Sequence, residues 1–333
     1  MRLMNVVTGP RGPDTSWLGV LLSGDYVGDL RGGHARFLSE VEVDPGESTV
    51  GRTSFPTSVA ELLRDGSVDA VRATYEWMSK LVKDDPSACD SDGRPLFVPL
   101  ADCQLLAPLS PSKLIAVGRN YLSHLEEADT TLDHRVPSAW IKANNTICGP
   151  GDDIVKPKAT QELDYETELS LVIGRRCKDV LESRAYEVLA GYTIVNDVSA
   201  RDVARTERKE GNQLLGKMFD TFAPMGPWLV TADEIPDPMN LRLLTRVNGE
   251  VRQDSNTNTM IWPIPKLIAY ISQMTLEPGD VITTGTPDGC AMGHEGENWF
   301  LKPGDILESE LEGIGVITNP VVDEPDKKAS WRW

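Results

Sequence analysis

Two glutamates separated by one residue, Glu166 and Glu168, have the spacing that first suggests chemistry in this sequence. They lie in the segment 163–174, whose alternation of apolar and polar residues predicts a β-strand. On a strand both carboxylates point to one face, where they repel each other unless a positive group lies between them. A divalent cation would meet this need; the alternative is the solvated face of an edge strand. Asp164 shares this face, and we interpret it as a flanking residue at the entrance of the strand.

A third carboxylate, Asp197, ends the apolar segment 191–197, which we also predict to be a strand. A charged residue is unusual at the end of an apolar strand unless it has a partner. We therefore consider Glu166, Glu168 and Asp197 together as metal ligands. A set of oxygen ligands favours Mg²⁺ or Mn²⁺, with Ca²⁺ as a further option, over zinc.

His124 is the candidate general base. The segment 121–128 has a helical pattern, and on a helix His124 and Glu127 are three residues apart and can touch. A carboxylate beside an imidazole fixes its tautomer and raises its basicity, which suits activation of water. The alternative is an ordinary His–Glu contact on a surface helix.

Two further residues could bind an anion. Lys217 precedes an apolar segment, where its ammonium could bind a carboxylate or stabilise an oxyanion; the alternative is a surface lysine. The turn 285–289 could direct backbone N–H groups and the Thr286 hydroxyl at an anion; the alternative is a plain loop.

The composition limits the partners. The chain has 333 residues, a formal charge of −18 and a pI of about 4.7, so nucleic acid and anionic membranes are unsuitable partners. Its sequence contains no long apolar run, and its first residues lack the apolar core of a signal peptide. The five cysteines are scattered and odd in number, which argues against a disulfide framework and fits a reducing cytoplasm.

The catalytic candidates must be positioned by a strand-rich domain. We predict an accessory region at 1–107, a catalytic domain at 108–322 and a charged tail at 323–333. Many short strands with turn signals predict a mixed α+β, β-rich fold with peripheral helices. The predicted strands are 17–22, 25–30, 113–117, 240–247, 249–252, 280–284, 304–308 and 315–318, and the predicted helices are 58–64, 68–82 and 264–274.

Taken together, these motifs resemble the fumarylacetoacetate hydrolase family, especially its acylpyruvate hydrolase and 2-hydroxyhepta-2,4-diene-1,7-dioate isomerase branch. The matching stretches keep the family order. They are 118–127, 164–174, 191–202, 216–228 and 276–287. The resemblance implies a distorted β-roll, a homodimer and a keto-acid substrate. It implies the following site: Glu166, Glu168 and Asp197 as metal ligands, His124 and Glu127 as the water-activating dyad, Lys217 as the active-site lysine, and Arg201 and Thr286 as substrate contacts.

The sequence departs from the family pattern at four positions. Ala143 stands where relatives often have proline, and Ala204 stands where many carry glutamine that contacts substrate. Asp288 follows the Gly-Thr-Pro turn where a small residue is commoner, and Cys290 lies two residues later. These departures concern the substrate more than the reaction.

The expected reaction is hydrolysis of the carbon–carbon bond of a 2,4-dioxo acid to pyruvate and a carboxylic acid. Three alternatives use the same site: decarboxylation of oxaloacetate, isomerisation of a 2-hydroxy-dienoate, and cleavage of a diketo-deoxy sugar acid. A metal-binding scaffold without activity is a fourth, which the full set of candidate residues argues against.

Overall fold

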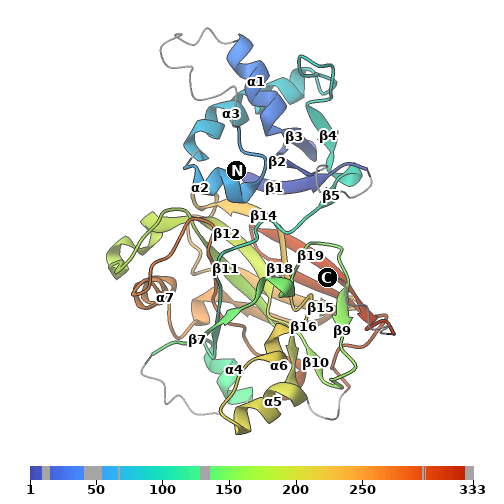
Figure 1. Cartoon of the computed structure of the whole chain (residues 1–333), viewed down its shortest axis with the longest axis vertical. Helices are drawn as coiled ribbons and strands as arrows, with labels where there is room; N and C mark the ends of the chain where they lie inside the picture. The colour runs from blue at the N-terminus through green and yellow to red at the C-terminus, as the bar shows by residue number, and fades with distance from the viewer. Residues whose placement is uncertain are drawn as a thin grey trace, which may run out of the picture.

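The computed structural model describes residues 1–9, 16–40, 55–66, 68–127, 136–294, 296 and 298–326. It confirms the predicted mixed α+β, strand-rich class, with helices at the periphery (Figure 1). No helix in these ranges is both long and apolar enough to cross a membrane. The strands are β1 Arg2–Val7, β2 Ser16–Leu22, β3 Tyr26–Asp29, β4 Phe97–Pro99, β5 Gln104–Leu105, β6 Leu114–Gly118, β7 Ser138–Lys142, β8 Ile147–Cys148, β9 Ile154–Lys156, β10 Leu163–Asp164, β11 Thr167–Ile173, β12 Leu189–Asn196, β13 Ser199–Ala200, β14 Ala223–Thr231, β15 Arg242–Val247, β16 Glu250–Asn256, β17 Val281–Thr283, β18 Ile306–Leu311 and β19 Gly315–Asp323. The α-helices are α1 Leu30–Glu40, α2 Val59–Arg64, α3 Val68–Asp84, α4 Leu122–Glu127, α5 Arg201–Lys209, α6 Leu215–Met218 and α7 Ile264–Ile271.

Two large sheets form the framework that holds the catalytic residues. The larger has the strand order β4-β3-β2-β1-β14-β12-β11-β17-β6-β7, and the smaller has the order β16-β15-β18-β19-β9. Strands β11, β12 and β14 of the first sheet pack against β15, β18 and β19 of the second. Their facing apolar side chains form a shared core that includes Leu171, Ile194, Leu243 and Ile317. This buried core holds the central strands rigidly, so side chains at their ends keep fixed positions.

The N-terminal segment forms an upper lobe in Figure 1, with helices α1 and α3 over strands β2 and β3. Antiparallel pairing of β1 with β14 makes its strands a continuation of the large sheet. Helix α2 begins as predicted, because the Ser58 hydroxyl accepts a hydrogen bond from the Glu61 backbone N–H at 3.2 Å. Helix α1 was not predicted, since it contains two glycines. A Cβ at Gly33 would lie 2.3 Å from the Met78 sulfur, so this glycine lets α1 approach α3.

The predicted continuous strand 163–174 is wrong in one respect, because it is interrupted at Tyr165 and Glu166. Strand β10 leaves the large sheet and pairs with β13, whereas β11 stays in the sheet between β12 and β17. The Glu166 N–H donates to the Asn196 side chain, and the Asp197 N–H donates to the Glu166 carbonyl, each at 2.8 Å. Every residue of β11 is buried, so the alternative of a solvated edge strand is also excluded.

The other predicted elements are present with shifted ends. Helix α7 ends at Ile271 rather than at residue 274, and the hairpin β15–β16 turns at Asn248 and Gly249 as predicted. Strand β19 reaches Asp323, so the predicted tail begins as part of the sheet; residues 327–333 lie outside the described ranges. The prediction for helix 121–128 holds for 122–127, and residue 128 is also outside them.

Candidate metal centre and active site

The predicted ligands Glu166, Glu168 and Asp197 meet at the end of β11 and β12. The pairing of Thr167 with Asn196 places the two strand ends side by side, and this register brings Asp197 beside the two glutamates. One carboxylate oxygen from each of the three residues lies within 4.8 Å of the others, and all three residues are buried. The backbone therefore assembles three hard oxygen ligands at the adjoining ends of two consecutive antiparallel strands.

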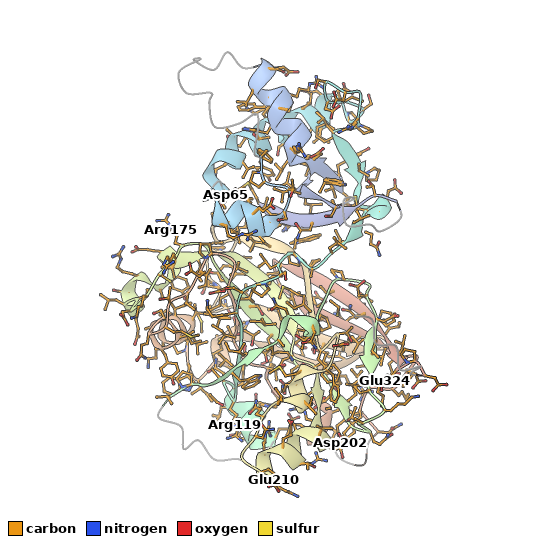
Figure 2. The ribbon with its side chains drawn as sticks, viewed as in Figure 1. Asp65, Arg119, Arg175, Asp202, Glu210 and Glu324 are labelled. Atoms are coloured by element: carbon orange, nitrogen blue, oxygen red, sulfur yellow. The ribbon has the colours of Figure 1, made fainter. Side chains whose placement is uncertain are left out.

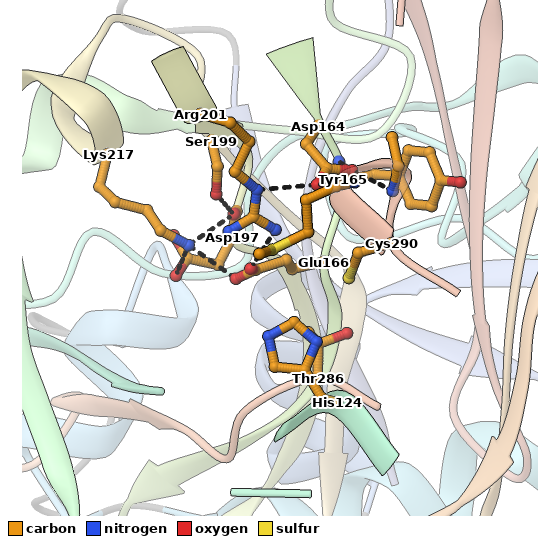
Figure 3. A network of polar contacts seen from close by, with 12 residues as sticks. His124, Asp164, Tyr165, Glu166, Asp197, Ser199, Arg201, Lys217, Thr286 and Cys290 are labelled. Atoms are coloured by element: carbon orange, nitrogen blue, oxygen red, sulfur yellow. Dashed lines mark hydrogen bonds and ion pairs between the residues drawn. The ribbon is translucent and has the colours of Figure 1, made fainter. Parts of the chain in front are cut away.

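Two lysines bind these carboxylates. The Lys217 ammonium donates to Glu166 Oε2 at 2.6 Å and to Asp197 Oδ2 at 2.8 Å (Figure 3). The Lys142 ammonium donates to the other Asp197 oxygen. Burial alone would lower the pKa of Lys217, but Asp197 and Glu166 outweigh it and raise that pKa. Lys217 is therefore a fixed positive charge and not a base.

Arg201 binds two carboxylates, those of Asp164 and Glu166. It donates from Nε to Asp164 Oδ2 at 2.7 Å and from its terminal nitrogen to Glu166 Oε1 at 2.5 Å. Although burial raises the pKa of Glu166, the charges of Arg201 and Lys217 outweigh it and hold that pKa well below its usual value. Asp164 is thus more than the flanking residue we predicted. It anchors Arg201 and accepts a hydrogen bond from the Ala291 N–H at 2.8 Å.

Replacing Arg201 by methionine tests this anchoring. The substitution leaves Asp164 and Glu166 buried without their cation, and we expect the free energy of unfolding to fall by about 3–5 kcal/mol. Arg205→Met is the control, because Arg205 pairs with Glu162 in a largely exposed contact worth at most about 1 kcal/mol. Chemical denaturation measures both. Equal losses in the two variants would contradict a buried anchoring role.

Glu168 has no ammonium or guanidinium partner among the described residues. Its carboxylate accepts a hydrogen bond from the Gly285 N–H at 2.8 Å. Burial, and then the charges of Asp197 and Glu166, raise its pKa well above the usual value. Among the described residues of this centre, four buried carboxylates, with Asp164 included, stand against three buried cations, Lys142, Arg201 and Lys217. The donor set and this excess negative charge fit a bound divalent cation.

The predicted dyad lies beside this centre. His124 Nδ1 is 3.4 Å from Glu127 Oε2, and both side chains are largely buried. The Gly289 N–H donates to Glu127 Oε1 at 2.9 Å, which fixes the glutamate. His294 Nε2 lies 3.8 Å from the same oxygen. Figure 3 shows the His124 ring next to Glu166 and Thr286. Glu127 thus orients an imidazole that faces the carboxylate centre.

His124 of the dyad and Glu166 and Glu168 of the carboxylate centre line one cavity of about 400 Å³. Its wall includes the predicted residues His124, Glu166, Glu168, Arg201, Lys217 and Thr286. Trp140 forms an apolar side of the cavity, with its ring centre 5.4 Å from the Lys217 ammonium. The Thr286 hydroxyl donates to the Thr167 carbonyl at 3.0 Å and accepts from Gln253 at 2.9 Å. The Thr286 hydroxyl proton therefore points at the Thr167 carbonyl.

Sequence reasoning missed Lys142, which binds Asp197 without lining the cavity, and several residues of the cavity wall. Lys142 was considered only as part of a departure from the family pattern, because a single lysine at the end of a strand carries no periodic signal. Arg119, Arg205, Arg208 and Gln213 line the cavity and were not proposed as site residues. A Cβ at Gly216 would lie 2.6 Å from the Ala204 methyl group, so helices α5 and α6 are in close contact there.

Comparison with known proteins identifies the family. The family described as Fumarylacetoacetate (FAA) hydrolase C-terminal matches residues 113–322. The human protein named oxaloacetate tautomerase FAHD2B, mitochondrial, is 45% identical over 228 residues, which are 68% of this chain and 71% of that protein.

Two solved structures extend the likeness to nearly the whole chain. A 5-carboxymethyl-2-hydroxymuconate delta-isomerase from Mycobacterium smegmatis is 34% identical, with a TM-score of 0.67, over 97% of this chain and 100% of that one. Maleylpyruvate hydrolase from Sphingobium sp. SYK-6, solved with manganese(II) and pyruvate, is 27% identical, with a TM-score of 0.71, over 98% of this chain and 100% of that one. The family matched over 113–322 and these relatives confirm the predicted resemblance: this chain belongs to the fumarylacetoacetate hydrolase family.

Proposed function

We propose that this protein is a divalent-metal-dependent hydrolase that cleaves the carbon–carbon bond of a 2,4-dioxo acid to pyruvate and a carboxylic acid. The observation that carries the proposal is His124, held by Glu127, on the wall of the cavity that Glu166 and Glu168 of the three-carboxylate cluster also line. A centre that only polarised a keto acid would not need a base for water. The manganese and pyruvate bound by the maleylpyruvate hydrolase relative support the same metal class and product.

Glu166, Glu168 and Asp197 would hold Mg²⁺ or Mn²⁺, with Ca²⁺ as an alternative. When bound, the metal ion supplies a Lewis acid that polarises the keto-acid oxygens. Positively charged side chains of the protein bind the part of the substrate's negative charge that the metal ion does not neutralise. Lys217 and Arg201 lie on the cavity wall, and the positive charge of these N–H donors can stabilise an oxygen that becomes negative during cleavage. Such positioned donors are worth about 3–4 kcal/mol each in comparable sites.

The dyad supplies the nucleophile. His124 takes a proton from a water molecule, and Glu127 stabilises the imidazolium that forms. The hydroxide adds to the 4-carbonyl carbon, and the C3–C4 bond then breaks with its electron pair moving to C3. A proton returns to C3 and gives pyruvate, while the former 4-carbonyl carbon leaves as the second carboxylic acid. Trp140 covers one side of the cavity and limits access of other water.

Product analysis tests the reaction class. Purified protein with Mg²⁺ or Mn²⁺ is incubated with a panel of acylpyruvates, oxaloacetate and diketo-deoxy sugar acids, and the products are identified by mass spectrometry. We expect pyruvate and one further acid in equal amounts from at least one acylpyruvate. Pyruvate with carbon dioxide from oxaloacetate alone would show a decarboxylase, and a changed substrate without cleavage would show an isomerase.

A second candidate is tautomerisation of oxaloacetate, which the 45% identical human relative favours by its name. In that reaction His124 would move a proton to and from C3 rather than from water. The ultraviolet absorbance of the enol form follows the reaction directly. Rapid loss of enol-oxaloacetate without release of pyruvate, together with inactivity on acylpyruvates, would select this candidate over hydrolysis.

We also propose a cytoplasmic homodimer as the working form. An apolar groove that includes the exposed side chains of Ile141, Tyr270 and Met274 supports an interface between copies. Sedimentation of the purified protein at micromolar concentration is expected to give twice the mass of one chain. A single-chain mass would contradict the proposal.

A further inference from the structure

The wall of the cavity carries more positive charge than a simple keto acid would need. Three arginines line it in addition to Arg201 and Lys217: Arg119 after strand β6, and Arg205 and Arg208 on helix α5. Figure 2 shows Arg119 at the same end of the molecule as the α5 segment between Asp202 and Glu210. The chain as a whole is strongly acidic, so this concentration of arginines is a local feature.

Arg208 is exposed and forms no ion pair with the described residues, although the charge of Glu166 acts on it from a longer distance. Arg205 is held by a salt bridge to Glu162, whereas no carboxylate of the described ranges lies within salt-bridge distance of Arg208. Desolvation of its guanidinium, and then the positive charge of Arg201, lower the pKa of Arg208. An anion bound beside Arg208 would relieve this repulsion.

Gln213 adds an uncharged hydrogen-bond donor to the wall of the same cavity. Its side-chain nitrogen Nε2 is buried and has no hydrogen-bond partner among the described residues, although the residue lines the cavity. A buried amide nitrogen without an acceptor costs free energy unless a ligand or water completes its bonding. A guanidinium and an amide N–H are both hydrogen-bond donors, and two such donors on one cavity wall can each bind an oxygen of a carboxylate.

We propose that Arg208 and Gln213 form a second anion subsite, which binds a carboxylate at the end of the substrate opposite its 2-oxo acid group. The inference rests on the proposed function, in which the 2-oxo acid group lies at the inner end beside Glu166 and Lys217. It selects dicarboxylic 2,4-dioxo acids as the substrate class. Acylpyruvates with a neutral alkyl end and sugar acids with hydroxyl groups at that end would leave Arg208 unpaired.

Calorimetry measures binding at this subsite independently of the cleavage reaction. With saturating Mg²⁺, binding of pyruvate, which has only the inner group, is compared with binding of 2-oxoglutarate, which adds a terminal carboxylate and has no 4-carbonyl to attack. We expect 2-oxoglutarate to bind about 10- to 100-fold more tightly, as hydrogen bonds to charged groups imply. Arg208→Gln should remove that advantage and leave pyruvate binding unchanged, and Arg208→Lys should restore part of it.

Lys209→Gln is the matched control, because Lys209 is exposed on helix α5 as Arg208 is, but does not line the cavity. Equal binding of the two acids by the wild-type protein, or an equal loss for both in Arg208→Gln, would overturn the subsite. If no dioxo acid is cleaved but 2-oxoglutarate binding still depends on Arg208, the subsite stands and the proposed hydrolysis fails. Among dioxo acids that are cleaved, Arg208→Gln should lower kcat/KM for 2,4-dioxoheptanedioate but not for its 7-methyl ester.

Discussion

Glu168→Gln is expected to abolish the dependence of both activity and thermal stability on divalent metal. Glu168 is the ligand without a cationic partner among the described residues, so the metal is its only strong source of compensation there. Loss of residues that merely orient ligands costs roughly 10- to 100-fold in metal affinity, and we expect removal of this ligand to cost more than about 100-fold. Wild-type protein should gain thermal stability as Mg²⁺ or Mn²⁺ is added, since the ion binds only the folded chain.

Without metal, the order of thermal stability should not favour the wild type. The folded state raises the pKa of Glu168, so the wild type loses stability as pH rises from the ordinary glutamate pKa to the raised one, and the full cost persists above it. The glutamine variant removes this cost, and its melting temperature in chelator should equal or exceed that of the wild type. Glu187→Gln on the surface is the control, and its metal response should be unchanged. Bound metal at wild-type stoichiometry and affinity in Glu168→Gln would show that the ligand assignment is wrong.

His124→Ala is expected to lower hydrolytic kcat by about 100- to 10,000-fold, which is the usual contribution of a positioned general base. Metal binding should remain, because His124 is not one of the three proposed ligands. His294→Ala is the informative comparison. Its ring also lies near Glu127 but does not line the cavity, and we expect at most about a 10-fold loss.

Steady-state release of pyruvate measures both histidine variants. If His124→Ala retains wild-type turnover, the dyad does not activate water. If His124→Ala and His294→Ala lose activity equally, Glu127 and its surroundings are more important than the imidazole that faces the cavity.

Local patterns in the sequence predicted the parts of the site that depend on local geometry. The spacing of His124 and Glu127 required only a helical turn, and α4 provides it. Ser58 and Glu61 fixed the start of α2 for the same reason. Bringing Asp197 to the two glutamates required the register of β11 with β12, which alternation within one strand does not specify. The ordered family motifs, not the spacing, supplied that link.

The missed features depend on contacts between distant segments. Lys142 reaches Asp197 only because β7 lies at the edge of the large sheet, and nothing around it in the sequence marks it. Helix α5 was missed because its residues are almost all polar, so it lacks the apolar period of a core helix. The break at Tyr165 was missed because alternation continues through it, although the backbone there bonds to Asn196 and Asp197 instead of a neighbouring strand.

The most direct test of the account is an oxygen-18 experiment on cleavage of a 2,4-dioxo acid by the metal-loaded protein in labelled water. Mass spectrometry follows the label in both products. We expect one labelled oxygen in the carboxylic acid released from the 4-carbonyl carbon, formed in equal amount with pyruvate, and loss of both products in His124→Ala. Consumption of the substrate without a labelled acid would contradict hydrolysis at this site.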